Sequence, residues 1–145
     1  MKKSITIRKF QEGDERECSE VVRDALIKEN SKDYPSSVIE FMVSFFTPEK
    51  MLEFNDTRTF FVAERATQEV SKIVGTVILT GETMGNLFVA SSCKLHGIGS
   101  MMMEKLETLA KEKGLRKVRL DASLTAIPFY EKLGYRIGKR KDTGE

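Results

Sequence analysis

The stretch Leu87–Ser100, LFVASSCKLHGIGS, decides how the rest of the chain is read. It begins with a short apolar run typical of a buried strand, continues through a polar loop, and ends with Gly97 and Gly99 at the start of an amphipathic segment. Glycine lets a phosphate oxygen approach the backbone, and the first turn of a helix offers unpaired N–H groups. The stretch therefore favours a phosphorylated ligand, although a tight turn alone would also explain two glycines.

The same residues do not fit two common phosphate-binding motifs. Gly97-Ile98-Gly99-Ser100 lacks the Gly-Lys-Ser or Gly-Lys-Thr ending of a P-loop. A dinucleotide-binding fold also has an acidic residue at a set distance after its first strand, where it binds the ribose. No acidic residue stands at that distance here. We expect a phosphate site of a different kind.

Hydrophobic periodicity on both sides of this stretch predicts the element order βααα-ββ-βα-βα-β. Asp14, Ser36 or Ser37, and Thr47 are the expected caps of the first three helices, and Gly114 is expected to end the fourth in a left-handed conformation. The predicted strands are 4–10, a hairpin of 60–63 with 72–80, 87–90, 117–121 and the start of one at 135–138. The predicted helices run from Asp14 to about Lys28, from Ser36 or Ser37, from Pro48, over 97–113 and over 125–133. The second of these helices is expected to have Val38, Phe41, Met42 and Phe45 on its apolar side.

Composition indicates one globular domain spanning residues 1–145. Of 145 residues, 40% are hydrophobic and 32% are charged, which is an ordinary globular balance. A net charge of +2, from 24 basic and 22 acidic residues, gives no broad field for nucleic acid or for an anionic membrane. No apolar run is long enough to span a bilayer, and the N-terminus has no signal-peptide core, so we expect a cytoplasmic protein.

Cysteine and histidine usage gives no sign of a metal site. Cys18 and Cys93 are far apart and unpaired by spacing, so we expect free thiols. His96 is the only histidine and has no cysteine or carboxylate at ligand spacing. We therefore predict that no metal is bound.

Two motifs resemble one known family, the GNAT N-acetyltransferases. Lys94-Leu95-His96-Gly97-Ile98-Gly99 is similar to the family signature, which is Gln or Arg, two residues, Gly, one residue, then Gly or Ala. Phe129-Tyr130-Glu131-Lys132-Leu133-Gly134-Tyr135 resembles the more specific C-terminal motif. The resemblance covers nearly the whole chain. It implies an α/β fold of the GNAT acyl-CoA acyltransferase type, with a central mixed twisted sheet flanked by helices and a shortened C-terminal strand region.

The resemblance implies transfer of the acetyl group of acetyl-CoA to a primary amine, by direct attack in a ternary complex. The strand backbone would pair with the pantetheine arm, and the N–H of Val89 would face the acetyl carbonyl. The loop and the start of the helix would wrap the pyrophosphate. Ser123 and Phe129 would lie near the thiol or the pantetheine. The cofactor-binding residues implied are Leu87, Phe88, Val89, Lys94, Leu95, His96, Gly97, Ile98, Gly99, Ser100, Ser123 and Phe129. Ser123 is equally well explained as a helix cap.

The resemblance also suggests the catalytic side chains. Tyr130 matches the tyrosine that protonates the leaving thiolate in many family members, with a role in core packing as the alternative. Glu82 is the nearest candidate for a general base, with a solvated carboxylate in a hairpin turn as the alternative. Glu64 and Asp121 are further candidates that nothing in the spacing ranks.

Departures from the family pattern leave several questions open. Lys94 replaces the usual Gln or Arg. A lysine keeps the positive charge of arginine but lacks the planar fork of its guanidinium. The few residues after 135–138 leave an unpaired strand edge, which favours a homodimer, with a solvated tail as the alternative.

The acceptor, a small molecule or a peptide amine, is expected against 29–54, whose aromatic residues are equally typical of a core. The competing function is a non-catalytic acyl-CoA-binding or sensing module.

Overall fold

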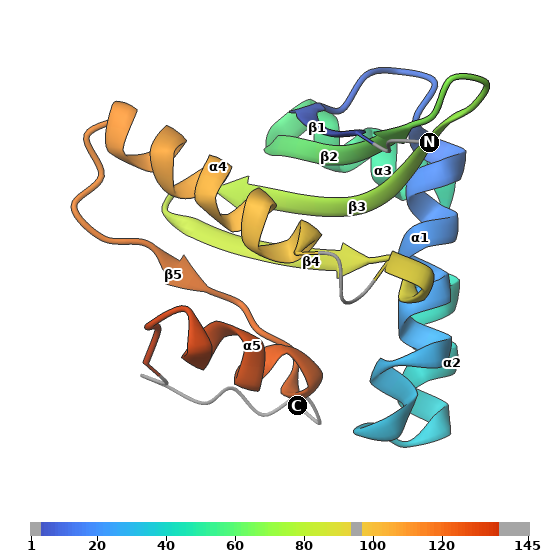
Figure 1. The fold of residues 1–145 in the computed structure, drawn as a ribbon. Coiled ribbons are helices and arrows are strands. Elements are labelled where there is room, and N and C mark those ends of the chain that lie inside the picture. The colour runs from blue at the N-terminus through green and yellow to red at the C-terminus, as the bar shows by residue number, and fades with distance from the viewer. Residues whose placement is uncertain (1–3, 94–96, 137–145) are drawn as a thin grey trace.

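The computed structural model describes residues 4–93 and 97–136, which form one five-stranded sheet with helices on both faces (Figure 1). The strands are β1 (Ser4–Lys9), β2 (Thr59–Ala66), β3 (Ser71–Thr80), β4 (Thr83–Val89) and β5 (Arg119–Leu120), and they lie in the order β1-β2-β3-β4-β5. The helices are α1 (Glu15–Lys28), α2 (Ser36–Phe45), α3 (Pro48–Thr57), α4 (Ile98–Glu112) and α5 (Ile127–Lys132), with 3-10 turns η1 (Asn30–Lys32), η2 (Ser91–Cys93) and η3 (Leu124–Ala126). Neighbouring strands are antiparallel from β1 to β4, whereas β5 is parallel to β4. The predicted mixed sheet is confirmed.

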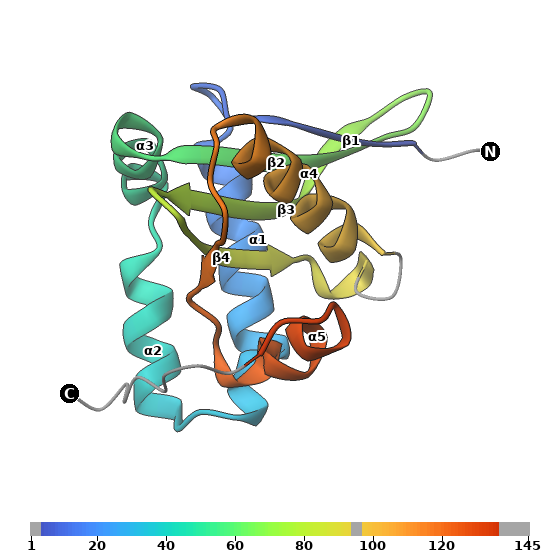
Figure 2. The ribbon, with the colours of Figure 1, turned by 90° about the vertical axis from the view of Figure 1, so that its left-hand side faces the viewer.

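The alternation of side chains along the strands divides the core into two layers. In β2, Phe60 and Val62 pack with α1 and α3, whereas Phe61 and Ala63 pack with α4 and α5. Successive residues of a strand point to opposite faces, so a run that is apolar at every position is buried on both sides. Figure 2 shows the result, with α1 on one side of the strands and α4 on the other.

Local signals placed most of the helix boundaries correctly. At α3, the Thr47 hydroxyl accepts a hydrogen bond from the Lys50 N–H at 3.2 Å, and Pro48 occupies the first turn as predicted. At the end of α4, Gly114 is left-handed with φ 81°, also as predicted. Cys18 and Cys93 are buried free thiols, which confirms that expectation.

One predicted cap was wrong, and a second has the predicted position without a side-chain capping bond. Helix α2 begins at Ser36 with Pro35 in the capping position, so neither Ser36 nor Ser37 acts as a cap. Asp14 does precede α1, but its carboxylate makes no capping bond to the helix because Arg8 and the Gln11 N–H occupy it. The predicted apolar side of α2 also needs correction, since Ile39 is its buried residue and Phe41 is 68% exposed.

The strands near the C-terminus also differ from the prediction. β4 begins at Thr83 rather than at Leu87, and β5 has two residues instead of the five at 117–121. Of the strand start predicted at 135–138, residues 135 and 136 are not in a strand, and 137 and 138 lie outside the described residues. Across the described ranges 4–93 and 97–136, no helix combines the length and apolar character needed to cross a membrane.

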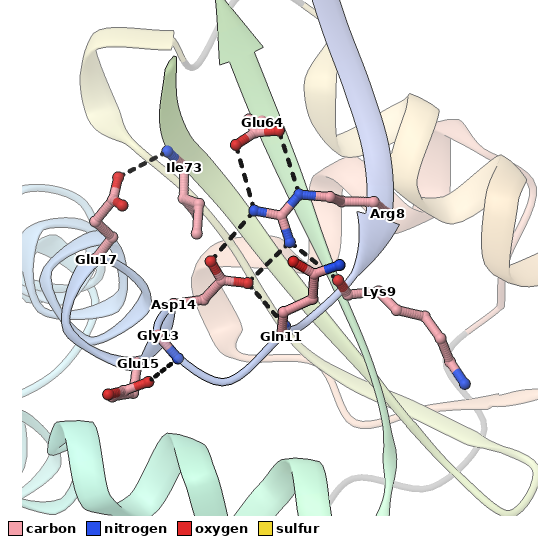
Figure 3. Close-up of polar contacts among 9 residues, drawn as sticks. All are labelled: Arg8, Lys9, Gln11, Gly13, Asp14, Glu15, Glu17, Glu64 and Ile73. Atoms are coloured by element: carbon pink, nitrogen blue, oxygen red, sulfur yellow. Dashed lines mark hydrogen bonds and ion pairs between the residues drawn. The ribbon is translucent and has the colours of Figure 1, made fainter. Parts of the chain in front are cut away.

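An arginine fixes the connection between β1 and α1 (Figure 3). Arg8 donates to both carboxylate oxygens of Asp14, at 2.8 and 3.2 Å, and to both of Glu64 on β2, at 3.2 and 3.3 Å. Burial raises the pKa of Asp14, but the bonds from Arg8 and the Gln11 N–H outweigh it, so this pKa lies below its usual value. The network ties the loop before α1 to the sheet.

Replacing Asp14 with Asn should destabilise the fold by about 1–2 kcal/mol near pH 7, because the Arg8 guanidinium loses a charged partner. The pKa of Asp14 is lowered on folding, so this contribution is present above the unfolded-state pKa of about 3.9 and is lost as pH falls below it. Urea unfolding at about pH 7 and at about pH 3 measures the difference between the two proteins.

Glu82→Gln is the matched control, because it neutralises a carboxylate whose Arg119 partner is exposed, and it should change stability by less than about 0.5 kcal/mol. A difference between wild type and Asp14→Asn that stays the same at both pH values would contradict the assignment.

Candidate active site at the divergence of β4 and β5

Strands β4 and β5 pair over only two residues and then separate. The N–H groups of Arg119 and Asp121 donate to the carbonyls of Glu82 and Met84, each at 2.8 Å. Beyond Met84, the described residues show no further pairing between the two segments. We call this divergence of β4 from residues 119–123 the fork, and Figure 1 shows the chain after β5 leaving β4 there.

A β-bulge in β4 bends the strand where the fork opens. Between the pairs Ile78↔Gly85 and Thr76↔Phe88, β3 contributes one residue whereas β4 contributes Asn86 and its successor. Asn86 has φ 52°, and its carbonyl accepts a hydrogen bond from the buried Thr76 hydroxyl at 3.1 Å. An extra residue of this kind bends its strand and increases the local twist. The bulge thus gives a local cause for the separation.

The backbone of Val89 faces the open side of β4. The Ala90 N–H donates to the Val74 carbonyl of β3 at 2.8 Å, so Ala90 belongs to a hydrogen-bonded pair. In an antiparallel ladder such pairs alternate with pairs whose N–H and C=O groups point away from each other. Val89 pairs with Gly75 at the next position, so its N–H and C=O point away from β3 and into the fork.

The start of α4 presents a second set of N–H groups, for which the helix itself supplies no acceptor. Gly97 precedes the helix in a left-handed conformation with φ 75°, and the Met101 N–H is bonded to its carbonyl at 3.1 Å. The N–H groups of Ile98, Gly99 and Ser100 stand in the first turn, where a helix offers no internal acceptor, and the helix dipole makes this end positive. Lys94, Leu95 and His96, expected to extend this group, lie outside the described residues.

Helix α5 packs against this first turn of α4. A Cβ added to Gly99 would lie 3.1 Å from Cζ of Phe129, so a glycine here allows the aromatic ring to approach. Tyr130 is 4% exposed and lies in the same core cluster as Ile98, with the rings of Phe129 and Tyr135 beside it. Burial raises the pKa of Tyr130, which keeps the phenol protonated.

The remaining predicted residues stand further from this cluster. Ser123 caps η3, where its hydroxyl accepts from the Ala126 N–H at 3.2 Å, as the alternative interpretation stated. Glu82 lies in the turn between β3 and β4 and pairs with Arg119 at 3.1 Å. With a rise of about 3.3 Å per residue, that turn is about 20 Å along β4 from Val89. The structure therefore brings Tyr130 and Phe129 to the start of α4 but places Glu82 at the other end of the strand.

The two other carboxylates considered from the sequence also have structural surroundings of their own. Glu64 accepts hydrogen bonds from Arg8, which lower its pKa. Asp121 lies beside Gly85, whose added Cβ would be 3.3 Å from the Asp121 Cβ. Within residues 4–93 and 97–136, no three histidine, cysteine or acidic side chains gather as a metal-ligand set.

Sequence reasoning missed contacts that connect the loop after α1 to the region before α5. The Leu124 N–H donates to the Tyr34 hydroxyl, and the Thr125 hydroxyl donates to the Asp33 carboxylate, each at 2.8 Å. No sequence signal identifies partners about ninety positions apart. The bulge did leave a signal, because Asn86 is a residue type that tolerates a positive φ and it follows Gly85.

The comparisons with known proteins agree with this geometry. The family model described as an acetyltransferase (GNAT) domain matches residues 56–137, which include the fork, α4 and α5. This match covers more than half of the chain. The chain therefore belongs to the GNAT acetyltransferase family.

One curated relative and two solved structures illustrate the similarity. The chain is 31% identical over 107 residues to a peptidyl-lysine N-acetyltransferase, YjaB, of Salmonella typhimurium, covering 74% of this chain and 65% of the relative. A GCN5-related N-acetyltransferase from Rhodopseudomonas palustris superimposes with a TM-score of 0.85 at 22% identity, over 97% of this chain and 88% of that one. PaiA N-acetyltransferase from Thermoplasma acidophilum, solved in complex with coenzyme A, gives 0.80 at 21% identity, over 95% and 93%.

The two structures show that the fold is shared. The chain spans 65%, 58% and 49% of the length of three curated relatives and 31% and 39% of two others.

The bulge provides a test of how the fork is built. Asn86→Val should destabilise the protein by about 1–3 kcal/mol, because a β-branched residue is strained at positive φ. Asn86→Gly is the matched control and should unfold within about 0.5 kcal/mol of wild type, since glycine adopts this conformation freely. Chemical denaturation measures both variants, and equal midpoints for Val and Gly would argue against a left-handed residue at this position.

Proposed function

We propose that the chain transfers the acetyl group of acetyl-CoA to a primary amine by direct attack in a ternary complex. The observation that carries the proposal is the open side of β4, where the N–H and C=O of Val89 point into the fork. β4 is half-buried, and a strand that has no strand partner on one side among the described residues is suited to an extended ligand that supplies one. The amide-bearing pantetheine arm of coenzyme A has this chemistry.

Two sets of backbone groups would hold the cofactor. Leu87, Phe88 and Val89 would pair with pantetheine as a strand pairs with its neighbour. The N–H groups of Gly97, Ile98, Gly99 and Ser100 would receive the pyrophosphate at the positive end of α4, as phosphates are held at other helix N-termini. Lys94, Leu95 and His96 stay predictions as further pyrophosphate ligands. Phe129, against Gly99, and Ser123 complete the predicted set.

The reaction needs one stabilised charge and one proton. The neutral amine attacks the thioester carbonyl carbon, and the Val89 N–H donates to the oxygen that becomes negative. Collapse of this intermediate breaks the C–S bond, and Tyr130 gives its proton to the departing thiolate. The new amide nitrogen loses a proton to solvent, and the Tyr130 phenolate regains one from solvent. Burial raises the pKa of Tyr130, which keeps the phenol protonated as a donor must be and also makes it a weaker acid toward the thiolate. The base role of Glu82 stays a prediction. Glu82 lies about 20 Å along β4 from Val89, so its carboxylate would have no direct contact with an amine there.

The amine acceptor is proposed from likeness to a relative. The Salmonella relative is named for acetylation of peptidyl-lysine, a primary amine, and this supports an amine acceptor for the present chain. The homodimer and the cytoplasmic location stay predictions. The described sheet has β1 and β5 as its outer strands, and either edge is available for pairing with a second copy.

Coenzyme A binding depends on the conformation of Gly97 under this proposal. Gly97→Val should weaken binding tenfold or more, an effect of about 1.4 kcal/mol, because a branched residue does not hold φ near 75° without strain. Gly97→Asn is the matched control, since Asn tolerates this conformation, and it should bind within about threefold of wild type. Isothermal titration calorimetry with coenzyme A measures both, and undiminished binding by the Val variant would reduce the glycine to a turn residue.

Tyr130→Phe should lower turnover by about tenfold or more while leaving the affinity for coenzyme A unchanged, because only the proton donor is removed. Thiol release from acetyl-CoA over a panel of amines, amino acids and lysine peptides gives the rate. Tyr135→Phe is the control, since its hydroxyl donates to Glu107 rather than facing the fork. Wild-type turnover by Tyr130→Phe would leave Tyr130 a packing residue. Tight acetyl-CoA binding without transfer to any amine would instead favour the non-catalytic acyl-CoA-binding module.

A further inference from the structure

A carboxylate on α1 holds the turn that follows β4. One oxygen of Asp24 accepts from both the N–H and the hydroxyl of Ser91, each at 3.1 Å, and the other pairs with Lys28 at 2.9 Å. Ser91 is the first residue of η2, so its N–H has no acceptor within that turn. Hydrogen bonds to an ionised carboxylate are roughly twice as strong as neutral ones. Asp24 therefore anchors the start of η2 to a helix 67 positions earlier in the chain.

This anchor begins where the sheet stops holding the chain. The Ala90 N–H still bonds to Val74 of β3, so the sheet fixes β4 up to that residue. The next N–H, that of Ser91, goes to Asp24. At the end of η2, Cys93 is buried and its sulfur accepts from the Arg65 guanidinium at 3.2 Å. The turn is thus held by α1 and β2, independently of the pairing that shapes the fork.

We propose that Asp24 is a positioning residue for the pyrophosphate half of the cofactor site, acting through Ser91. The inference rests on the proposed function. Cys93 of η2 shares a buried core cluster with Ile98 of α4, so the place of η2 bears on the N–H groups at the start of α4. When such a segment is held only part of the time, apparent affinity falls by the fraction of time it is correctly placed. Asp24 raises that fraction without touching the reacting atoms.

Two thioesters separate this role from a general structural one. Acetyl-CoA carries the pyrophosphate, whereas S-acetylpantetheine lacks it and relies on the β4 side of the fork alone. Asp24→Ala should lower kcat/KM for acetyl-CoA about tenfold, mainly through KM, and change the value for S-acetylpantetheine by less than about twofold. Calorimetry with coenzyme A should show a matching loss of about tenfold in affinity, which needs no knowledge of the acceptor.

Three further variants make the test specific. Lys28→Ala removes the 62% exposed partner of the same carboxylate and leaves Ser91 bonded. It should leave kcat/KM unchanged for both acetyl-CoA and S-acetylpantetheine. Asp24→Asn keeps an oxygen acceptor for the Ser91 N–H and should restore most of the affinity. Ser91→Ala, which loses only the hydroxyl donor, should weaken coenzyme A binding about threefold and keeps the proposal testable if Asp24→Ala does not fold.

The outcomes distinguish this inference from the proposed function. If Asp24→Ala loses kcat/KM equally for acetyl-CoA and S-acetylpantetheine, or for neither, the positioning role of Asp24 is overturned. The proposed acetyltransferase activity is not affected by either result. Absence of coenzyme A binding by the wild-type protein would overturn the proposed function itself, and the positioning role with it.

Discussion

The two sides of β4 differ in how far the strand is hydrogen-bonded, and this difference shapes the site. Toward β3 the strand is paired almost throughout, whereas toward β5 it is paired only at Thr83 and Met84. The bulge at Asn86, held by the Thr76 hydroxyl, bends the strand between these two regimes. The N–H and C=O of Val89 point into the fork, where the proposed pantetheine arm would pair with them. Val89 packs against the same core cluster as residues of α4 and α5.

The sequence predicted best those elements whose signals are local. The Thr47-Pro48 start of α3 and the left-handed Gly114 depend on a few adjacent residues, and both were placed correctly. Asp14 had the right position and the wrong partner, because Arg8 offered a charged guanidinium in place of a helix N–H. The early part of β4 was missed because Gly85 and the bulge interrupt the alternation that marks a strand.

The site divides in the same way. Gly97 and Tyr130 belong to short motifs, so their neighbourhood could be predicted before any fold was known. The bond between Asp24 and Ser91 joins residues 67 positions apart, and that between Tyr34 and Leu124 joins residues 90 apart. Such pairs leave no trace in a single sequence, because a carboxylate or a hydroxyl on a helix is ordinarily solvated. Only the fold reveals which of them restrain the site.

The segment formed by α4 and α5 and the segment around α2 differ in packing, and this difference explains why a sequence motif marks only the first. On the cofactor side, the ring of Phe129 lies against Gly99 and Tyr130 shares a buried cluster with Ile98, so α4 and α5 form one packed unit. Packed contacts restrict the residue types that fit, and restricted residue types produce a recognisable motif. On the other side, α2 buries only Ile39 among its residues and leaves Phe41 exposed. With few buried contacts to restrict it, this segment can change its side chains without disturbing the fold, which is why no recognisable motif marks it.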